Sequence, residues 1–251
     1  MQVQRLTFML AIASAFAGSL SASTIISGTF DLDGSITATL DTITWTSNGN
    51  IANEATIENN SDLSGSFVGL GDTNVTIADL NRATEPVGAA FSAQDFVNFL
   101  AAPTFPMLMI NYIDAGADTS TDCGITTPMV GQTCTPAVPG GSPFGFQNTG
   151  PGGPGSTDVT GSTATFSFSG LTSDGLSTWS GVFTAQFNEP YQTVLADLSN
   201  PNFSVTNSYS DSNLVITLSS GVPEPGGLTL MGVGLVLLAA GRVRFHRKPS
   251  R

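Results

Sequence analysis

The side chains able to do chemistry are few, and a pair of cysteines comes first among them. Cys123 and Cys134 are the only cysteines of the 251-residue chain. They could hold a metal or carry redox chemistry, but zinc usually takes about four ligands, no C-x-x-C spacing occurs, and the one histidine is His246 near the C-terminus. In an exported chain the pair favours a disulfide, which would close a short loop and contribute on the order of 3 kcal/mol.

Aspartates close to the first cysteine are the candidates for ion binding. Asp114, Asp118 and Asp122 offer the hard oxygen ligands that calcium prefers. They lack the spacing of an EF-hand loop and its terminal glutamate, so an acidic surface loop explains them as well. We therefore predict no metal and no cofactor, and keep these three aspartates as calcium candidates.

Catalytic groups are scarce in the body of the chain, residues 24–221. The body contains no histidine and no lysine, which excludes Ser-His and Cys-His nucleophilic catalysis and Schiff-base chemistry. Paired carboxylates could still serve a glycoside hydrolase. We predict that the protein is not an enzyme and keep a glycoside hydrolase as the remote alternative, because no recognisable motif contains the glutamates of the body: Glu54, Glu58, Glu85 and Glu189.

The charge of the body is strongly negative. Of the seven lysines and arginines only Arg82 lies within 24–221, and of the nineteen acidic residues only Glu224 lies outside it, which leaves a net charge of −17. Nucleic-acid binding requires a basic surface and is excluded. The acidity suits a soluble domain at an extracellular surface.

Residues 1–23 have the layout of a secretory signal peptide. Arg5 is the sole charge before an apolar stretch from Leu6 to Leu20, and Ser21-Ala22-Ser23 offers small residues for cleavage. An uncleaved membrane anchor is the alternative, but the apolar stretch is short and rich in alanine and serine. We expect export and cleavage near residue 23.

The C-terminal residues 222–251 combine three features in a fixed order. A stiff Val222-Pro223-Glu224-Pro225 step comes first, and an uncharged apolar segment, 226–241, follows it. As a transmembrane helix this segment would be roughly 24 Å long, short of a ~30 Å hydrocarbon core but able to span it with local thinning. A buried core helix is the alternative, whereas a stop-transfer anchor is favoured by the basic residues that follow: Arg242, Arg244, Arg247 and Lys248.

This order of a Pro-Glu-Pro step, a short hydrophobic helix and an arginine-rich end resembles the PEP-CTERM sorting signal of exopolysaccharide-producing Gram-negative bacteria. The resemblance covers residues 222–247 only. It implies that Pro223, Glu224 and Pro225 are recognised by an exosortase, a transpeptidase-like membrane enzyme that removes the tail during export. It also implies a precursor anchored in the inner membrane that then reaches the cell surface or the extracellular space.

Period-2 alternation of apolar and polar residues predicts many short strands in the body. We predict an all-β antiparallel sandwich or jelly roll, with a tight hairpin turn at Asp33-Gly34 and another connection at Asp174-Gly175. The expected strands are Ile26–Leu32, Ile36–Leu40, Ile43–Trp45, Leu63–Leu70, Leu108–Ile113, Ala164–Phe168, Trp179–Phe187, Phe203–Asn207 and Leu214–Leu218.

One short helix is expected to interrupt the strands, over Ser92–Ala101. Ser92 can cap it, with Asp95 three residues later in the capping-box position. Phe96 and Phe99 would form its apolar face, and the helix would end before Pro103.

A long loop is expected over residues 114–157. This segment holds both cysteines and many prolines and glycines, which cannot sustain the hydrogen bonds of a sheet along its length. It would be either an insertion that lies on the core or a linker between two halves. Phe144 and Phe146 indicate that it docks at one point at least.

These features predict an exported, non-enzymatic cell-surface or extracellular-matrix protein, and the resemblance of the tail implies association with extracellular polysaccharide or biofilm. The expected partners are an exosortase-like transpeptidase, the inner membrane and extracellular polysaccharide. The alternative is a carbohydrate-binding β-sandwich module with an exposed aromatic platform for the glycan. Candidates for that platform are Trp45, Trp179, Tyr191 and Tyr209, although Trp179 alternates in phase with Phe183 and Phe187, which favours a core position.

Overall fold

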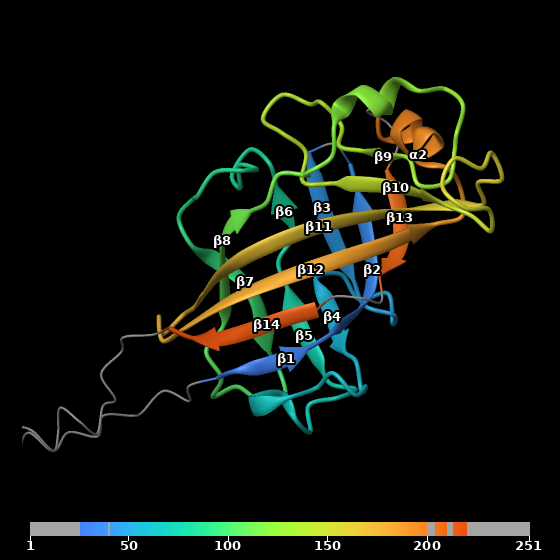
Figure 1. Ribbon diagram of the computed structural model, residues 1–251. Coiled ribbons are helices and arrows are strands. Elements are labelled where there is room, and N and C mark those ends of the chain that lie inside the picture. Colours follow the sequence, from blue (N-terminus) through green and yellow to red (C-terminus); the bar gives the residue numbers. More distant parts are fainter. Residues whose placement is uncertain (1–25, 40, 200–203, 210–212, 220–251) are drawn as a thin grey trace, which may run out of the picture. The chain divides into compact units, whose positions relative to one another are not determined.

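Strands account for most of the secondary structure in the computed structural model, which describes residues 26–39, 41–199, 204–209 and 213–219. Fourteen strands form one sheet over these residues, and their pairings are antiparallel (Figure 1). The predicted all-β class and its antiparallel pairing are confirmed. The strands are β1 (Gly28–Phe30), β2 (Leu32–Ala38), β3 (Thr42–Thr46), β4 (Glu54–Ile57), β5 (Asn74–Ile77), β6 (Leu80–Asn81), β7 (Gln94–Phe99), β8 (Leu108–Ile113), β9 (Thr133–Cys134), β10 (Gly145–Thr149), β11 (Gly161–Thr172), β12 (Ser177–Phe187), β13 (Val205–Tyr209) and β14 (Asn213–Leu218).

The sheet closes on itself, which the sequence analysis did not anticipate. The pairing runs β12-β13-β2-β4-β5-β7-β8-β11, and β11 then pairs with β12. These eight strands form a barrel, so the predicted sandwich or jelly roll is wrong at the level of architecture. Closure gives each of these eight strands a partner on both sides, and β1, β6 and β9 remain at the edges of the sheet.

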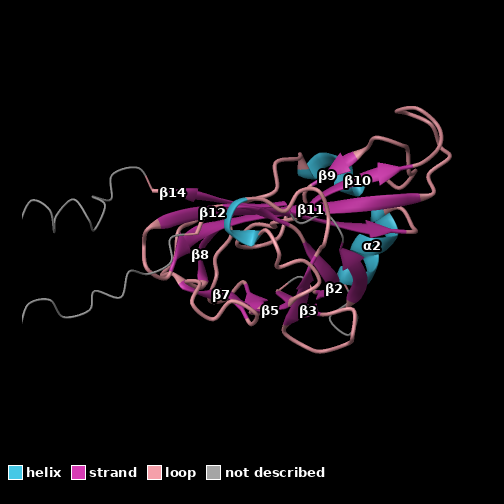
Figure 2. Cartoon of the chain, turned by 90° about the horizontal axis from the view of Figure 1, so that it is seen from below, coloured by secondary structure: helices cyan, strands magenta, loops and turns pink. Residues whose placement is uncertain are grey.

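The two longest strands carry extensions on either side of the ring. The first half of β11 pairs with β10, which pairs in turn with β9, and the second half of β11 pairs with β8. The first half of β12 pairs with β14, and β14 pairs with β1. Figures 1 and 2 show the result: β9 and β10 lie toward one end of β11, and β14 lies toward the other.

The barrel interior is filled with aromatic rings around Trp45 of β3. Its ring centroid lies 5.0 Å from that of Phe183 and 5.4 Å from that of Tyr209. Phe96, Phe166 and Phe168 complete the shell at 6.1–6.3 Å. All these side chains are buried. Interlocking rings at these distances add to the stabilisation that burial of apolar area provides.

The helix predicted over Ser92–Ala101 is wrong, because this segment contains strand β7. A register shift between Asp95 and Val97 marks an irregularity where β7 pairs with β8. Such a bulge breaks the alternation, so the consecutive residues Phe96 and Val97 are both buried. The spacing of Phe96 and Phe99 therefore imitates a helix although the backbone is extended.

The one α-helix of the described residues is α2, Tyr191–Leu198. It follows Pro190, whose fixed φ is compatible with a helix start. Tyr191, Val194 and Leu198 are buried at the i, i+3, i+7 spacing of a single helix face. The described residues thus contain one short α-helix, as predicted, but it lies at Tyr191–Leu198 and not at Ser92–Ala101.

Two further local predictions are wrong. Asp33-Gly34 makes no turn, because both residues lie inside β2, where Gly34 pairs with Tyr209. A Cβ atom on Gly34 would lie 2.8 Å from the Tyr209 hydroxyl and 2.7 Å from the Thr46 carbonyl oxygen, so the glycine serves close packing. Within Leu63–Leu70 the chain forms the 3₁₀ turn η1, Gly65–Phe67, instead of a strand.

The segment 114–157 is more ordered than a loop. It contains the 3₁₀ turn η2 (Ser120–Gly124) together with β9 and β10. Phe144 and Phe146 are buried in the core cluster, which confirms the predicted docking. Strand β8 has the predicted bounds, and Gly175, with φ of 71°, makes the turn between β11 and β12.

The predicted signal peptide, residues 1–23, and the predicted C-terminal signal, 222–251, lie outside the described residues. Within the residues that are described, no helix has the length and apolar character needed to cross a membrane.

Replacing Trp45 with alanine tests the central role of this ring. The Trp45→Ala variant should lose about 3–5 kcal/mol of unfolding free energy, because it leaves a cavity among five aromatic neighbours. Urea unfolding followed by circular dichroism measures the loss. The control is Val182→Ala, at a 41 % exposed position on β12, which should stay within about 0.5 kcal/mol of the wild type. A Trp45→Ala loss below about 1 kcal/mol would contradict the assignment.

Candidate functional site

A groove of about 560 Å³ lies on the outer side of strands β9, β10 and β11. Alternation along β11 turns Ala164, Phe166 and Phe168 into the barrel and therefore turns the residues between them outward. The segment 114–118 forms the opposite wall. The polar residues that line the groove are Asp114, Asp118, Thr133, Gln147, Thr163, Thr165 and Ser167.

The pairing of β10 with β11 sets the spacing of one wall. Gln147 lies directly opposite Thr163, and Gly145 lies opposite Thr165. Because Gly145 has no side chain, the groove stays open beside Thr165. A Cβ atom placed on Gly145 would lie 3.0 Å from an oxygen of the Asp118 carboxylate, so this carboxylate stands directly over the glycine.

Backbone hydrogen bonds hold the opposite wall in place. The Asp114 N–H donates to the Ser167 carbonyl at 3.0 Å, and the Gly116 N–H donates to the Ser142 carbonyl at 2.8 Å. The Asp118 N–H donates to the Thr135 hydroxyl at 3.1 Å. These bonds use main-chain groups, so the two carboxylates stay free to act on a ligand.

Several groove side chains make no side-chain hydrogen bond to another described residue. They combine carboxylate acceptors with hydroxyl and amide groups that both donate and accept. All are exposed or half-buried, so water or a ligand can satisfy them. They are Asp114, Asp118, Thr133, Gln147, Thr163 and Ser167.

A neighbouring cluster of amides shows the contrast. Asn148 donates to Gln192 at 3.1 Å and to Gln132 at 3.3 Å, and its oxygen accepts the Tyr191 N–H at 2.9 Å. Gln192 also donates to Gln132 at 3.1 Å. These side chains satisfy one another and fasten the start of α2 to β10, so their role is structural.

The predicted disulfide between Cys123 and Cys134 is confirmed. It joins η2 to β9, with the two Cα atoms 5.1 Å apart. Cys134 is fully buried and directly follows the groove residue Thr133. The bridge therefore fixes the strand that closes one side of the groove.

The three calcium candidates do not assemble into one site. Asp114 and Asp118 share the groove, whereas Asp122 lies in η2, where its carbonyl oxygen accepts the Tyr191 hydroxyl at 3.0 Å. Across the described residues no group of three or more histidine, cysteine, aspartate or glutamate side chains is placed to hold a metal ion. The structure thus gives no support to a calcium site built on all three.

The prediction that exposed aromatic rings form a platform for a glycan is wrong. Trp45, Trp179, Tyr191 and Tyr209 are all buried, with exposed fractions of 0–2 %. Burial raises the pKa of both tyrosines above its ordinary value, with a smaller contribution from Asp122 at Tyr191 and from Asp33 at Tyr209. Because they are buried, none of these four rings is placed to stack on a sugar.

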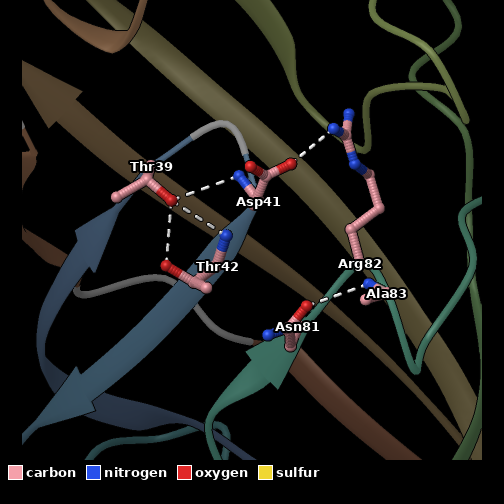
Figure 3. Close-up of polar contacts among 6 residues, drawn as sticks. All are labelled: Thr39, Asp41, Thr42, Asn81, Arg82 and Ala83. Atoms are coloured by element: carbon pink, nitrogen blue, oxygen red, sulfur yellow. Dashed lines mark hydrogen bonds and ion pairs between the residues drawn. The ribbon is translucent and has the colours of Figure 1, made fainter. Parts of the chain in front are cut away.

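Arg82, the one cation of the body, lines a second, smaller pocket. Its side chain points toward Asp41 (Figure 3). Its guanidinium forms an ion pair with Asp41. The Thr39 hydroxyl accepts the N–H groups of Asp41 and Thr42 at 3.1 and 3.0 Å, which holds the Asp41 loop beside β6. With a volume of about 30 Å³ the pocket admits little more than a water molecule, so we assign the ion pair to loop attachment.

Sequence reasoning found only part of this groove. It singled out Asp114 and Asp118, but it placed Gln147 in a loop and gave Thr163 no role. The feature that could have revealed Gln147 is the alternation of buried Phe146 and Asn148 with exposed Gln147, because this alternation is typical of a strand such as β10. The sorting residues and the basic tail lie outside the described residues: Pro223, Glu224, Pro225, Arg242, Arg244, Arg247 and Lys248.

Loss of the disulfide should destabilise the protein. The double variant Cys123→Ala, Cys134→Ala should lose about 3 kcal/mol of unfolding free energy, because its unfolded chain is no longer cross-linked. Urea unfolding with and without a reductant measures this. Reductant should lower the midpoint of the wild type and leave that of the double variant unchanged. An unaffected wild-type midpoint would contradict the proposed contribution.

The buried tyrosines predict a loss of stability at alkaline pH. Because the folded state raises the pKa of Tyr209, its contribution is fully present below pH 10, the ordinary tyrosine pKa, and is lost as the pH rises above it. Each such group removes about 1.4 kcal/mol per pH unit. Since the Tyr209 hydroxyl has no hydrogen-bond partner among the described residues, Tyr209→Phe should be nearly neutral at pH 7 and should flatten the alkaline slope. An unchanged slope between pH 10 and 11.5 in urea unfolding would rule this out.

Comparison with known proteins does not assign a role to the groove. No protein-family model, no curated protein and no solved structure matches this chain. The function is therefore inferred from the chemistry of the groove and from the two ends of the sequence.

Proposed function

We propose that this protein is an exported, non-enzymatic cell-surface or extracellular-matrix protein that an exosortase-like transpeptidase sorts and that associates with extracellular polysaccharide. The sorting part is supported by the ordered C-terminal features and by the signal-peptide layout of residues 1–23. The disulfide between Cys123 and Cys134 is consistent with an oxidising compartment outside the cytoplasm.

The observation that carries the polysaccharide part is the groove with its unpaired polar side chains. Sugars present many hydroxyl groups, each able to donate and to accept a hydrogen bond. The hydroxyl groups of Thr133, Thr163 and Ser167, the Gln147 amide and the aspartate carboxylates offer matching partners. A groove of this volume, open along one side, suits a chain of sugar units.

The groove also favours binding over catalysis. The two carboxyl groups of a glycoside hydrolase must flank the bond that is cut. Asp114 and Asp118 instead come from the same short segment of the chain, at one wall. Carbohydrate binding as the principal role is the second candidate, and it rests on this groove instead of an aromatic platform.

Analysis of the mature C-terminus tests the sorting proposal. In a host with an exosortase, mass spectrometry should find the residues after about Glu224 missing, because the Pro-Glu-Pro step marks the tail for removal. The mature body should be recovered with the extracellular polysaccharide.

The matched control replaces Pro223, Glu224 and Pro225 with alanine. This variant should keep its tail and remain in the membrane fraction. A wild-type protein that still ends at Arg251 in such a host would refute the processing and leave a simple membrane anchor.

A further inference from the structure

The geometry points to a binding site for glycan chains that carry no acidic groups, in the groove between the 114–118 segment and strands β9, β10 and β11. This inference rests on the proposed association with polysaccharide and names the class of sugar that the groove accepts. It depends on the charges in the groove, on its unpaired hydrogen-bonding groups and on its position in the barrel.

The charges in the groove are of one sign. Among the described residues, Asp114 and Asp118 line it, and no lysine, arginine or histidine does. The body's one cation, Arg82, lines a different pocket and is bound to Asp41. A uronate, sulfate or phosphate group in the groove would meet two carboxylates with no counter-charge, within the ~8 Å range over which charges act at physiological salt.

Neutral sugars fit the same groups well. Carboxylates only accept hydrogen bonds, and bonds from hydroxyl groups to a carboxylate are among the stronger ones. Gln147 and the hydroxyl residues can accept or donate, so they adapt to either direction of a sugar hydroxyl. Ala115, Ala117 and Pro143 add apolar surface for the C–H face of a sugar ring.

The groove lies at the end of β11 that is remote from the two ends of the body. The Ile26 carbonyl accepts the Ser177 hydroxyl at 2.9 Å, and the Ser219 N–H donates to the Leu176 carbonyl at 3.0 Å, so both ends lie beside the β11–β12 turn. From Thr163 to Thr172 an extended strand covers roughly 30 Å. Strand β10, which lines the groove, and strand β14, which leads to the C-terminal end of the body, therefore lie toward opposite ends of β11 (Figure 1).

The test compares matched glycans that differ only in charge. Purified exopolysaccharide of the host is separated into neutral and acidic fractions, and part of the acidic fraction is carboxyl-reduced to neutral sugars. Titration calorimetry with the body, residues 24–221, should show that the neutral and the carboxyl-reduced material bind at least about tenfold more tightly than the acidic material, because two carboxylates oppose each acidic group.

Two double variants show whether the groove carboxylates cause this selectivity. Asp114→Asn with Asp118→Asn should bring the ratio of affinities close to one. Asp62→Asn with Asp95→Asn removes the same charge from exposed positions elsewhere and should leave the ratio unchanged. Selectivity that falls equally in both would mean that only the net charge of the body matters and would overturn the site.

Variants within the groove locate the bound glycan. Gly145→Met would fill the hollow opposite Thr165 without changing the charge, and only the movable Asp118 carboxylate stands close to the new Cβ. This variant, and Gln147→Ala separately, should weaken binding of the neutral glycan at least about threefold, the effect of losing one ordinary hydrogen bond. Thr178→Ala, on the outer face of β12 at the other end of the barrel, should bind like the wild type.

The outcomes separate this inference from the proposed function. Binding that favours the acidic fraction, or that survives Gly145→Met in a folded variant, would overturn the neutral-glycan site and leave the association with polysaccharide standing. Absence of binding to every fraction by a folded wild-type body would refute both. Circular dichroism and urea unfolding of each variant confirm that it is folded.

Discussion

The pairing of β11 with β12 is the interaction on which the rest of the structure depends. It runs without interruption from Ser162 opposite Phe187 to Leu171 opposite Thr178, and it closes the ring of strands. Inward residues of these two strands supply Phe166, Phe168 and Phe183 to the core, and outward residues of β11 supply one wall of the groove. The same ladder therefore fixes both the packing of the interior and the polar surface outside it.

The composition of the body fits a fold with an aromatic interior and an acidic, polar surface. With hardly any cation available, the fold cannot rely on ion pairs, and Arg82 with Asp41 forms the one ion pair found among the described residues. Stability comes instead from aromatic packing around Trp45 and from the sheet hydrogen bonds. Apart from the buried Asp31 and Glu85, the acidic side chains of the described residues are exposed or half-buried, where water and salt weaken the repulsion between them.

The sequence was sufficient where buried and exposed residues alternate along a strand, as in Trp179–Phe187 of β12, and insufficient where the backbone departs from regularity. The bulge in β7 made an extended segment look helical, because it placed the neighbouring residues Phe96 and Val97 on the same side. Closure into a barrel depends on which strands meet, and alternation within a strand carries no such information. For the same reason the sequence predicted only part of the groove. Gln147 and Thr163 lie opposite each other only because β10 pairs with β11, and no pattern within either strand indicates this pairing.

The antiparallel contact of β14 with β12 has a mechanical consequence. Register pairs run from Ser177 opposite Leu218 to Val182 opposite Asn213, and Leu218 is the last residue of β14. If the groove is pulled by a bound polymer while the C-terminal end is held, the force runs along these strands. Their hydrogen bonds lie across that direction, so the whole ladder is sheared together and no single pair has to carry the load alone. Strand β14, although it lies outside the ring of eight strands, is thereby joined to the barrel strand β12 in a shear geometry.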